Sequence, residues 1–221
     1  MTLPTAVIFD CDGVILQSNS LKSNAFAEVL QGYEPRLVTE FVNWHRATGG
    51  VSRYFKFEHF FRKVLIDPDW EEKTVQACAD FAVLVSDGLK ACDTIPGFEL
   101  LAAQLHEKDI PMAVNTGGAE DEVRRVFAER GMAKSFQTIF GSPETKRGNM
   151  EKLKDLGLAV PGSTYLGDAE LDFVLAHDFG LNFIYVAHES EWLDGAHVTQ
   201  AAGGKVVADL TMLLTGRPMS L

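Results

Sequence analysis

The clearest candidates for chemistry are two aspartates one residue apart, Asp10 and Asp12, directly after a short apolar run. Side chains alternate faces along a strand, so both carboxylates can lie on one side while Cys11 points away. Two carboxylates at the end of an apolar strand repel each other unless a cation or a bound proton compensates them. Asp and Gly are also common in ordinary turns, so a turn without chemistry stays open as an alternative.

Three more polar segments follow apolar runs later in the chain. Thr116 and the adjoining Gly117-Gly118 turn offer a hydroxyl and backbone amides at the expected start of a helix, where an anion binds well. Lys146 follows another apolar run and, taken alone, would be a solvated surface lysine. Asp168 could bind a cation or simply cap the next helix. Asp172 lies one turn further along the same helix face.

The four segments resemble, in order and at workable separations, the four motifs of the haloacid dehalogenase (HAD) superfamily. The likeness is closest to its Mg2+-dependent phosphohydrolases and its β-phosphoglucomutase-like branch. Each motif is weak alone, but together they cover nearly the whole chain and are specific for the superfamily, although not for a substrate. The matching segments are Asp10-Cys11-Asp12-Gly13-Val14, Ala113-Val114-Asn115-Thr116-Gly117-Gly118, Gly141-Ser142-Pro143-Glu144-Thr145-Lys146 and Gly167-Asp168-Ala169-Glu170-Leu171-Asp172.

The resemblance implies a role for each catalytic candidate. Asp10 would be the nucleophile that forms an aspartyl-phosphate, and Asp12 the general acid and then the general base. Burial and the neighbouring carboxylate should raise the pKa of Asp12 and help it hold a proton near neutral pH. Thr116 and Lys146 would bind the phosphate oxygens. The haloalkanoate dehalogenases and phosphonate hydrolases of the superfamily lack the second aspartate, so Asp12 favours phosphate-ester chemistry.

The resemblance also implies a Mg2+ cofactor. This ion prefers octahedral oxygen coordination, typically with one or two carboxylates and several waters. Asp10, the backbone carbonyl of Asp12 and the Asp168 carboxylate would be its protein ligands. Asp172 would support the water shell of the metal or position Lys146.

Composition narrows the class of protein. The chain has 221 residues, 46% hydrophobic and 23% charged, as in an ordinary globular protein. Its net charge of -11 argues against non-specific nucleic-acid binding. No run approaches the roughly 18 apolar residues of a membrane span, and no signal-type segment is seen. The three cysteines (Cys11, Cys78, Cys92) lack metal-type spacing and suit a reducing compartment. We expect a cytoplasmic monomer or small homo-oligomer that acts on a small phosphorylated metabolite.

Apolar, β-rich segments alternate with amphipathic helical patterns through most of the chain. This alternation predicts an α/β fold with a doubly wound parallel sheet, the Rossmann-like core of the resembled superfamily. Ligands of such sheets lie beyond the carboxyl ends of the strands, where the motif residues fall. The expected strands are 5–9, 110–115, 137–140, 163–167, 182–187 and 205–208.

Residues 17–90 break this alternation with four apolar stripes at helical spacing. A connection this long without structure would be anomalous, so we expect a four-helix insert. Residues 1–16 and 91–221 would then form the catalytic core. The resemblance implies that residues 17–90 form a C1-type cap, which closes over the site and selects the substrate. Seven phenylalanines fall in the insert and should pack its interior.

Two cations of the insert are candidates for substrate binding. Gly50-Val51-Ser52-Arg53 resembles the specificity loop of the β-phosphoglucomutases, and Lys22 stands where that branch carries a histidine. Arg53 and Lys22 could contact a second anionic group or sugar hydroxyls. Both could equally be exposed helix charges.

The sequence as a whole favours a Mg2+-dependent phosphatase that hydrolyses a small phosphate monoester, with a sugar phosphate as one candidate. The alternatives are a phosphomutase of the β-phosphoglucomutase type and a non-catalytic phosphate-binding regulatory domain. Mutases usually carry an acidic residue before the last motif's first aspartate, where this chain has Gly167, and a histidine in place of Lys22. Both departures favour hydrolysis. A regulatory domain should have lost a catalytic carboxylate, yet all of them are present.

Overall fold

Six short strands form one parallel sheet in the order β3-β2-β1-β4-β5-β6. The structure, a computed structural model, describes residues 3–214. Every neighbouring pair of strands is parallel, and β1 lies between β2 and β4. The α/β fold with a doubly wound sheet is therefore confirmed, and each expected strand overlaps an observed one. The strands are β1 (Val7–Phe9), β2 (Met112–Ala119), β3 (Thr138–Ser142), β4 (Thr164–Gly167), β5 (Asn182–Val186) and β6 (Lys205–Val207).

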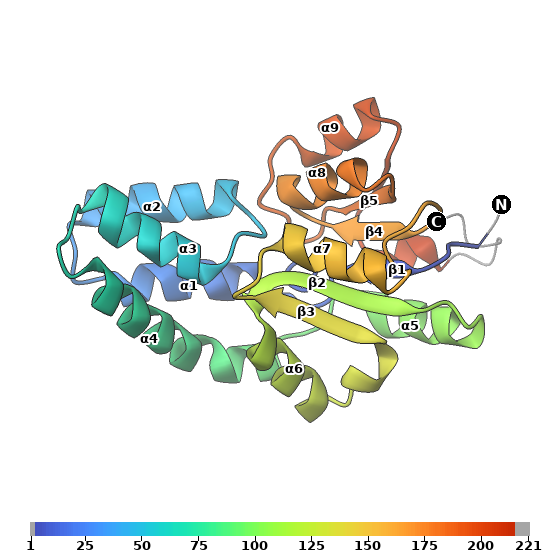
Figure 1. The fold of residues 1–221 in the computed structure, drawn as a ribbon, viewed down its shortest axis with the longest axis horizontal. Coiled ribbons are helices and arrows are strands. Elements are labelled where there is room, and N and C mark those ends of the chain that lie inside the picture. Colours follow the sequence, from blue (N-terminus) through green and yellow to red (C-terminus); the bar gives the residue numbers. More distant parts are fainter. Residues whose placement is uncertain (1–2, 215–221) are drawn as a thin grey trace.

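Helices cover both faces of the sheet (Figure 1). Side chains of β1 alternate between the two faces, so that Val7 and Phe9 join one apolar cluster and Ile8 joins the other. The first cluster includes α5 and α6, and the second includes α7 and α8. The helices that follow the insert are α5 (Phe98–Glu107), α6 (Glu120–Glu129), α7 (Lys146–Asp155), α8 (Glu170–Asp178) and α9 (Gly195–Ala201), with 3-10 turns at Ala133–Ser135 and Leu210–Leu213.

The helical insert, defined here as α1 to α4, lies beside the end of the sheet toward which the β3 arrowhead points (Figure 1). It contains α1 (Asn19–Val29), α2 (Pro35–Ala47), α3 (Arg53–Glu58) and α4 (Trp70–Ala91). Its interior is aromatic: Phe26 packs 4.5 Å from Phe81 and 5.0 Å from Phe57, measured between ring centroids. Of the seven phenylalanines expected to pack here, Phe55 is the exception, because 55% of it is exposed.

The third expected helix changes its winding partway. After α3 the chain continues as a π-helical turn, His59–Val64, in which the Leu65 amide donates to the Phe60 carbonyl five residues earlier. The wider turn allows two consecutive aromatic residues, Phe60 and Phe61, to be buried together. A regular helix would place these neighbours about 100° apart around its axis.

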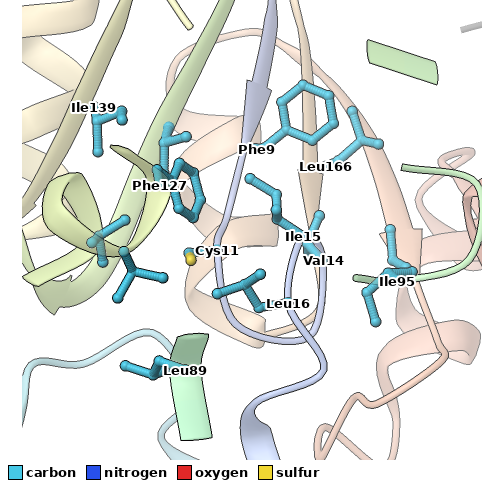
Figure 2. Close-up of a cluster of buried hydrophobic side chains, with 14 of the residues drawn as sticks. Phe9, Cys11, Val14, Ile15, Leu16, Leu89, Ile95, Phe127, Ile139 and Leu166 are labelled. Atoms are coloured by element: carbon cyan, nitrogen blue, oxygen red, sulfur yellow. The ribbon is translucent and has the colours of Figure 1, made fainter. Parts of the chain in front are cut away.

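The turn after β1 divides polar from apolar side chains. Figure 2 shows Cys11 among apolar residues that include Leu16 and Phe127. Asp10 and Asp12 instead line a pocket between the sheet and the helical insert. The two aspartates therefore share a side while Cys11 points away, as the alternation predicts. Among residues 3–214, none of the helices combines the length and the apolar character that a membrane span requires.

Candidate active site

The four motif segments meet at the carboxyl edge of the sheet. Asp10 directly follows β1, and Asp168 directly follows β4. Lys146 is the first residue of α7, whose start is fixed by the Thr145 hydroxyl accepting from the Gly148 amide at 3.0 Å. Because the strands are parallel, their carboxyl ends bring together residues that lie far apart in the sequence.

Lys146 lies between two carboxylates. Its Nζ is 3.0 Å from Asp10 Oδ2 and 2.6 Å from Asp172 Oδ1. Burial alone would lower the pKa of Lys146, but these flanking carboxylates raise it well above its usual value, so the side chain is a permanent cation. The Tyr165 hydroxyl also donates to Asp172 Oδ1 at 2.9 Å. Asp172 is thus placed to hold Lys146 against Asp10, and Lys146 is not a solvated surface lysine.

Three buried carboxylates form a compact acidic cluster. One oxygen from each of Asp10, Asp168 and Asp172 lies within 4.8 Å of the others. Burial, with the nearby Asp172 and Asp12 charges, raises the pKa of Asp10 to about 7 against the opposing effect of Lys146. Burial and the Asp10 and Asp172 charges likewise raise the pKa of Asp168 well above its usual value. The raised pKa values mean that Lys146 alone does not compensate three ionised carboxylates at this position.

The donor set of this cluster fits a hard divalent cation. Carboxylate oxygens are the ligands that Mg2+ prefers. Asp172 already uses Oδ1 for Lys146 and Tyr165, and its Oδ2 accepts from the Ala169 amide. Asp10 and Asp168 are therefore the better placed carboxylate ligands. Asp168 does not cap the following helix, because the N-cap of α8 is Ala169.

Gly13 makes room for this cluster. Its φ of +74° lies in the left-handed region that favours glycine, and a Cβ there would stand 2.3 Å from Asp168 Oδ2. Asp168 Oδ2 also accepts from Asn19 Nδ2 at 2.7 Å. The turn after β1 and the first helix of the insert both reach the Asp168 carboxylate.

The expectation for the pKa of Asp12 is wrong. Burial does act to raise it, but Lys22 Nζ lies 2.5 Å from Asp12 Oδ2, and the Ser18 hydroxyl donates to Asp12 Oδ1 at 2.6 Å. Together these contacts lower the pKa of Asp12 below its usual value. Asp12 is thus ionised near neutral pH before any ligand binds. Sequence proximity to Asp10 suggested repulsion, whereas the dominant neighbour is a lysine from α1.

Thr116 and Gly117 lie in the irregular end of β2 and not in a separate turn. Regular pairing with β3 stops at Asn115 and resumes at Ala119, and α6 begins only at Glu120. Thr116 is fully buried, and its hydroxyl oxygen accepts from the Gly118 amide at 3.0 Å. The pocket wall contains Gly117, whereas Thr116 stands behind it. The strand continues because Ala119 still pairs with Ser142.

The loop between α2 and α3 lies close to Gly117 and Lys146, on the sheet side of the pocket. A Cβ on Gly117 would lie 2.3 Å from the Gly50 carbonyl oxygen, and a Cβ on Gly50 would lie 3.2 Å from Lys146 Nζ. Gly50 has a φ of +79°, in the left-handed region. Glycines on both sides therefore permit close backbone contact between the insert and the sheet.

Lys22 and Arg53 are buried, so the alternative of exposed helix charges is wrong. Both line the pocket, but each already has a carboxylate partner. Lys22 pairs with Asp12, and Arg53 forms a two-pronged ion pair with Glu122 at the start of α6. Arg53 also lies 4.6 Å from the ring centre of Phe81. Arg53 thus joins the insert to the core.

The pocket contains residues that the sequence did not single out. His45 and Lys56 come from the insert, and Glu191 from the segment after β5. A signal for Lys56 existed: it stands four residues before the buried Phe60, on the apolar face of its helix. The position of Glu191 just beyond a strand end was a further signal. The histidines of the sequence have no metal-type spacing, and spacing says nothing about the other contacts of His45.

The enclosed space is small. The cavity measures about 70 Å³, well below the roughly 300–1,000 Å³ of pockets for drug-sized ligands. Its walls carry carboxylates on the sheet side and Lys22, Arg46, Arg53 and Lys56 on the insert side. The arrangement suits a small anionic ligand between the carboxylates of the sheet and the basic side chains of the insert.

Comparison with known proteins agrees with this geometry. A model of the family "Haloacid dehalogenase-like hydrolase" matches residues 7–186. A phosphoglycolate phosphatase from Rhodobacter capsulatus is 27% identical over 188 residues, which are 81% of this chain and 82% of that protein.

Solved structures show the same fold. One is described as a predicted phosphoglycolate phosphatase from Haemophilus somnus; its TM-score is 0.75 at 17% identity, over 97% of this chain and 98% of that one. Another is a β-phosphoglucomutase from Clostridium difficile, with a TM-score of 0.73 at 16% identity, over 96% and 93% of the two chains. The family match spans all four motif segments, and the chain therefore belongs to the haloacid dehalogenase-like hydrolases.

Proposed function

We propose that the protein is a Mg2+-dependent phosphatase that hydrolyses a small phosphate monoester through an aspartyl-phosphate on Asp10. The observation that carries this proposal is the position of the Asp10 carboxylate. It lies 3.0 Å from the buried Lys146 ammonium, belongs to the acidic cluster with Asp168, and lines the pocket beside Asp12. Carboxylate nucleophiles of this kind divide phosphoryl transfer into two easier steps.

In the first step an Asp10 oxygen attacks phosphorus, the bond to the ester oxygen breaks, and Asp12 gives that oxygen a proton. In the second step Asp12 takes a proton from water, and the resulting hydroxide attacks phosphorus to release phosphate and free Asp10. Asp12 begins ionised because Lys22 contacts it, so it must take up a proton from solvent as the substrate binds. A bound phosphoryl group gives Lys22 a second anionic partner, which weakens its effect on Asp12 and lets burial raise the pKa of Asp12.

The remaining polar groups counter the charge of the reacting centre. Lys146 would stabilise phosphate oxygens, with the Gly117 backbone beside them. Thr116, which is fully buried behind Gly117, would fix the position of the Gly118 amide through its hydroxyl. Asp10, Asp168 and the backbone carbonyl of Asp12 would hold Mg2+. The bound ion would offset the repulsion between the anionic nucleophile and the anionic substrate. Asp172 would either position Lys146 or support the water shell of the ion, and its contacts with Lys146 and Tyr165 favour the first role.

Two observations support a small substrate and hydrolysis over transfer. The cavity is only about 70 Å³, which suits a short phosphate ester better than a sugar bisphosphate. A Cβ at Gly167 would lie 2.3 Å from the Asp172 Cβ, so the acidic residue that mutases carry here would displace Asp172. The relative from Rhodobacter capsulatus, named a phosphoglycolate phosphatase, supports phosphate-ester chemistry.

We further propose that residues 17–90 act as a cap over the core formed by 1–16 and 91–221. Contacts from α1, α3 and the Gly50 loop to the core would hold the closed arrangement seen here. Opening at these contacts would admit substrate and release product. The three free cysteines, buried or half-buried, are consistent with a cytoplasmic enzyme.

The test is phosphate release from a panel of phosphorylated metabolites and p-nitrophenyl phosphate with Mg2+. Asp10→Asn should fall below about a hundredth of wild-type turnover and still unfold in one cooperative transition, as a folded protein does. Asp155→Asn, at an exposed position on α7, is the matched control and should keep full activity. Retained turnover in Asp10→Asn, without deamidation back to Asp, would contradict the covalent mechanism. A bisphosphate primer added in parallel tests the mutase alternative, since a phosphatase needs none.

A further inference from the structure

Lys56 is a buried cation in the pocket wall that lacks a carboxylate partner. Only 2% of the residue is exposed, although it lines the pocket. Within residues 3–214 its Nζ contacts two neutral acceptors of His45, namely Nδ1 at 2.8 Å and the backbone carbonyl at 3.1 Å. An ammonium has three donors, so these contacts leave one donor without a protein partner.

The other cations on the same wall differ from Lys56 in this respect. Lys22 pairs with Asp12, and Arg53 pairs with Glu122. Arg46 pairs with Glu191 at 3.1 Å. Each of these three charges is already offset by a carboxylate of the protein. Lys56 is the cation of this group whose charge is not matched by an ion pair in the described part of the chain.

His45 holds Lys56 in one orientation. Because Lys56 donates to Nδ1, the proton of the neutral imidazole is on Nε2, which faces the Ser23 hydroxyl at 3.1 Å. The Ser23 hydroxyl in turn donates to Glu191 at 3.2 Å. Burial and the adjacent Lys56 charge lower the pKa of His45 to about 2, so His45 stays neutral and accepts. The chain of contacts from Glu191 to Lys56 fixes where the ammonium points.

An ammonium buried in this way is costly for the protein on its own. Taking a charge out of water is unfavourable unless an opposite charge compensates it. The burial of Lys56 accordingly lowers its pKa to about 7, against the opposing influence of the more distant Glu191. An anion beside Nζ would restore the charge and occupy the third donor. Lys56 lines the same pocket as Asp10 and Asp12, so such an anion would lie in the pocket of the reacting centre.

We propose that Lys56 binds a carboxylate of the substrate, so that the substrate class is small phosphate monoesters with a carboxylate near the phosphate. This inference rests on the proposed phosphatase function and specifies its substrate. One ammonium and a cavity of about 70 Å³ suit a planar carboxylate better than a second phosphate, which would need more donors and more space. The Phe26 ring, whose centre lies 5.9 Å from Nζ, forms an apolar part of the same pocket wall.

The test compares two esters of equal length, phosphoglycolate and 2-hydroxyethyl phosphate, which differ in the distal carboxylate. For the wild type with Mg2+, kcat/KM for phosphoglycolate should exceed that for 2-hydroxyethyl phosphate by about ten- to a hundredfold, the effect of one charged hydrogen bond. In Lys56→Met this ratio should fall to near one. Lys63→Met, at an exposed position of the same insert, should keep both the ratio and the activity of the wild type.

The kcat/KM ratios of these variants decide whether Lys56 binds the substrate carboxylate. A wild-type ratio near one, or a high ratio that persists in Lys56→Met, would overturn the assignment. Lys56→Gln keeps a donor for His45 without the charge. It should show the same loss of the kcat/KM ratio, and it replaces Lys56→Met in the test if that variant does not fold. Phosphate release from neither ester nor from p-nitrophenyl phosphate would overturn the proposed function, and the Lys56 assignment with it. Hydrolysis of both esters at equal rates would instead overturn the Lys56 assignment alone.

Discussion

The Lys22 ammonium lies 2.5 Å from the Asp12 carboxylate and binds the first helix of the insert to the turn after β1. Both side chains are mostly buried, with 11% and 17% of them exposed. The contact sets the charge of the proposed acid–base group before substrate arrives. A residue of the insert therefore acts on the proton chemistry of the core and not only on the choice of substrate.

Lys22→Met should move the acidic limb of the kcat profile to higher pH. Lys22 lowers the pKa of Asp12, so its removal leaves burial as the dominant influence and raises that pKa. The ionised Asp12 needed to activate water would then form only at higher pH. Steady-state kinetics from pH 4 to 9 on p-nitrophenyl phosphate measure the shift, with Lys63→Met as the control. An unchanged profile would mean that Asp12 is not the titrating group.

Asp10→Asn should stabilise the metal-free protein, and more so as the pH rises. Burial raises the pKa of Asp10 from 3.8 to about 7, so between these values the folded state binds a proton that the unfolded state has lost. The Asp10 carboxyl therefore destabilises the fold progressively above about pH 4 and fully above about pH 7. Urea unfolding in EDTA at pH 5 and 8 should show the gain of Asp10→Asn growing by up to a few kcal/mol.

Excess Mg2+ should make the wild type more stable than Asp10→Asn, because the wild type then gains binding free energy that Asp10→Asn lacks. A stability difference that stays the same at both pH values would contradict the raised pKa of Asp10. A difference unaffected by Mg2+ would contradict its role as a ligand.

Asp168→Ala should abolish most of the thermal stabilisation by Mg2+. Asp168 has an oxygen free of protein cations, whereas Asp172 is committed to Lys146 and Tyr165. Differential scanning fluorimetry against Mg2+ concentration should show a normal shift for the wild type and almost none for Asp168→Ala. EDTA should silence wild-type activity, and added Mg2+ should restore it. Full activity in chelator would overturn the metal assignment.

Gly117→Ala should impair closure of the insert without unfolding the core. The added Cβ would stand 2.3 Å from the Gly50 carbonyl oxygen, a backbone atom that can move only with its loop. A displacement of about 1 Å at a catalytic centre can cost on the order of a hundredfold in rate. We expect kcat/KM to fall at least about tenfold with little change in melting temperature. Gly32→Ala, where a Cβ meets nothing within 4 Å, is the control.

The core of the fold could be predicted from local pattern, and the resemblance to a family then indicated which residues meet at the edge of the sheet. Short β-rich runs identified the strands, and parallel pairing then placed Asp10, Lys146 and Asp168 at one edge. The strength of the Lys22–Asp12 contact could not be predicted, because it depends on how α1 is oriented against the core. Motif spacing indicates Asp10, which repels the Asp12 carboxylate. It does not indicate Lys22, which attracts that carboxylate.

The contacts between the insert and the core could not be predicted from the sequence, for the same physical reason. Arg53 and Glu122 are 69 positions apart, and no periodicity relates them. The sequence does not mark Lys56 as a pocket residue, because a lysine between phenylalanines is usually at the edge of an apolar stripe, with its charge in water. Here the apolar interior of the insert borders the pocket. A lysine at this position therefore places its ammonium in the pocket wall.

The Arg53–Glu122 ion pair should show strong energetic coupling in a double-mutant cycle. Only 4% and 5% of the two side chains are exposed, so Arg53→Met or Glu122→Gln alone strands a buried polar partner. For Arg53→Met the loss in free energy of unfolding should reach about 3–5 kcal/mol. The double variant should lose less than the sum of the two single losses.

Urea unfolding at one pH measures all four proteins of this cycle. The exposed pair Arg36–Glu40, with 81% and 58% of its side chains accessible, is the control, and its coupling should not exceed about 0.5 kcal/mol. A coupling as weak for Arg53–Glu122 would mean that water reaches the pair in solution. The insert would then stand open in the resting enzyme, and the contacts of Lys22 and the Gly50 loop would form only when substrate binds.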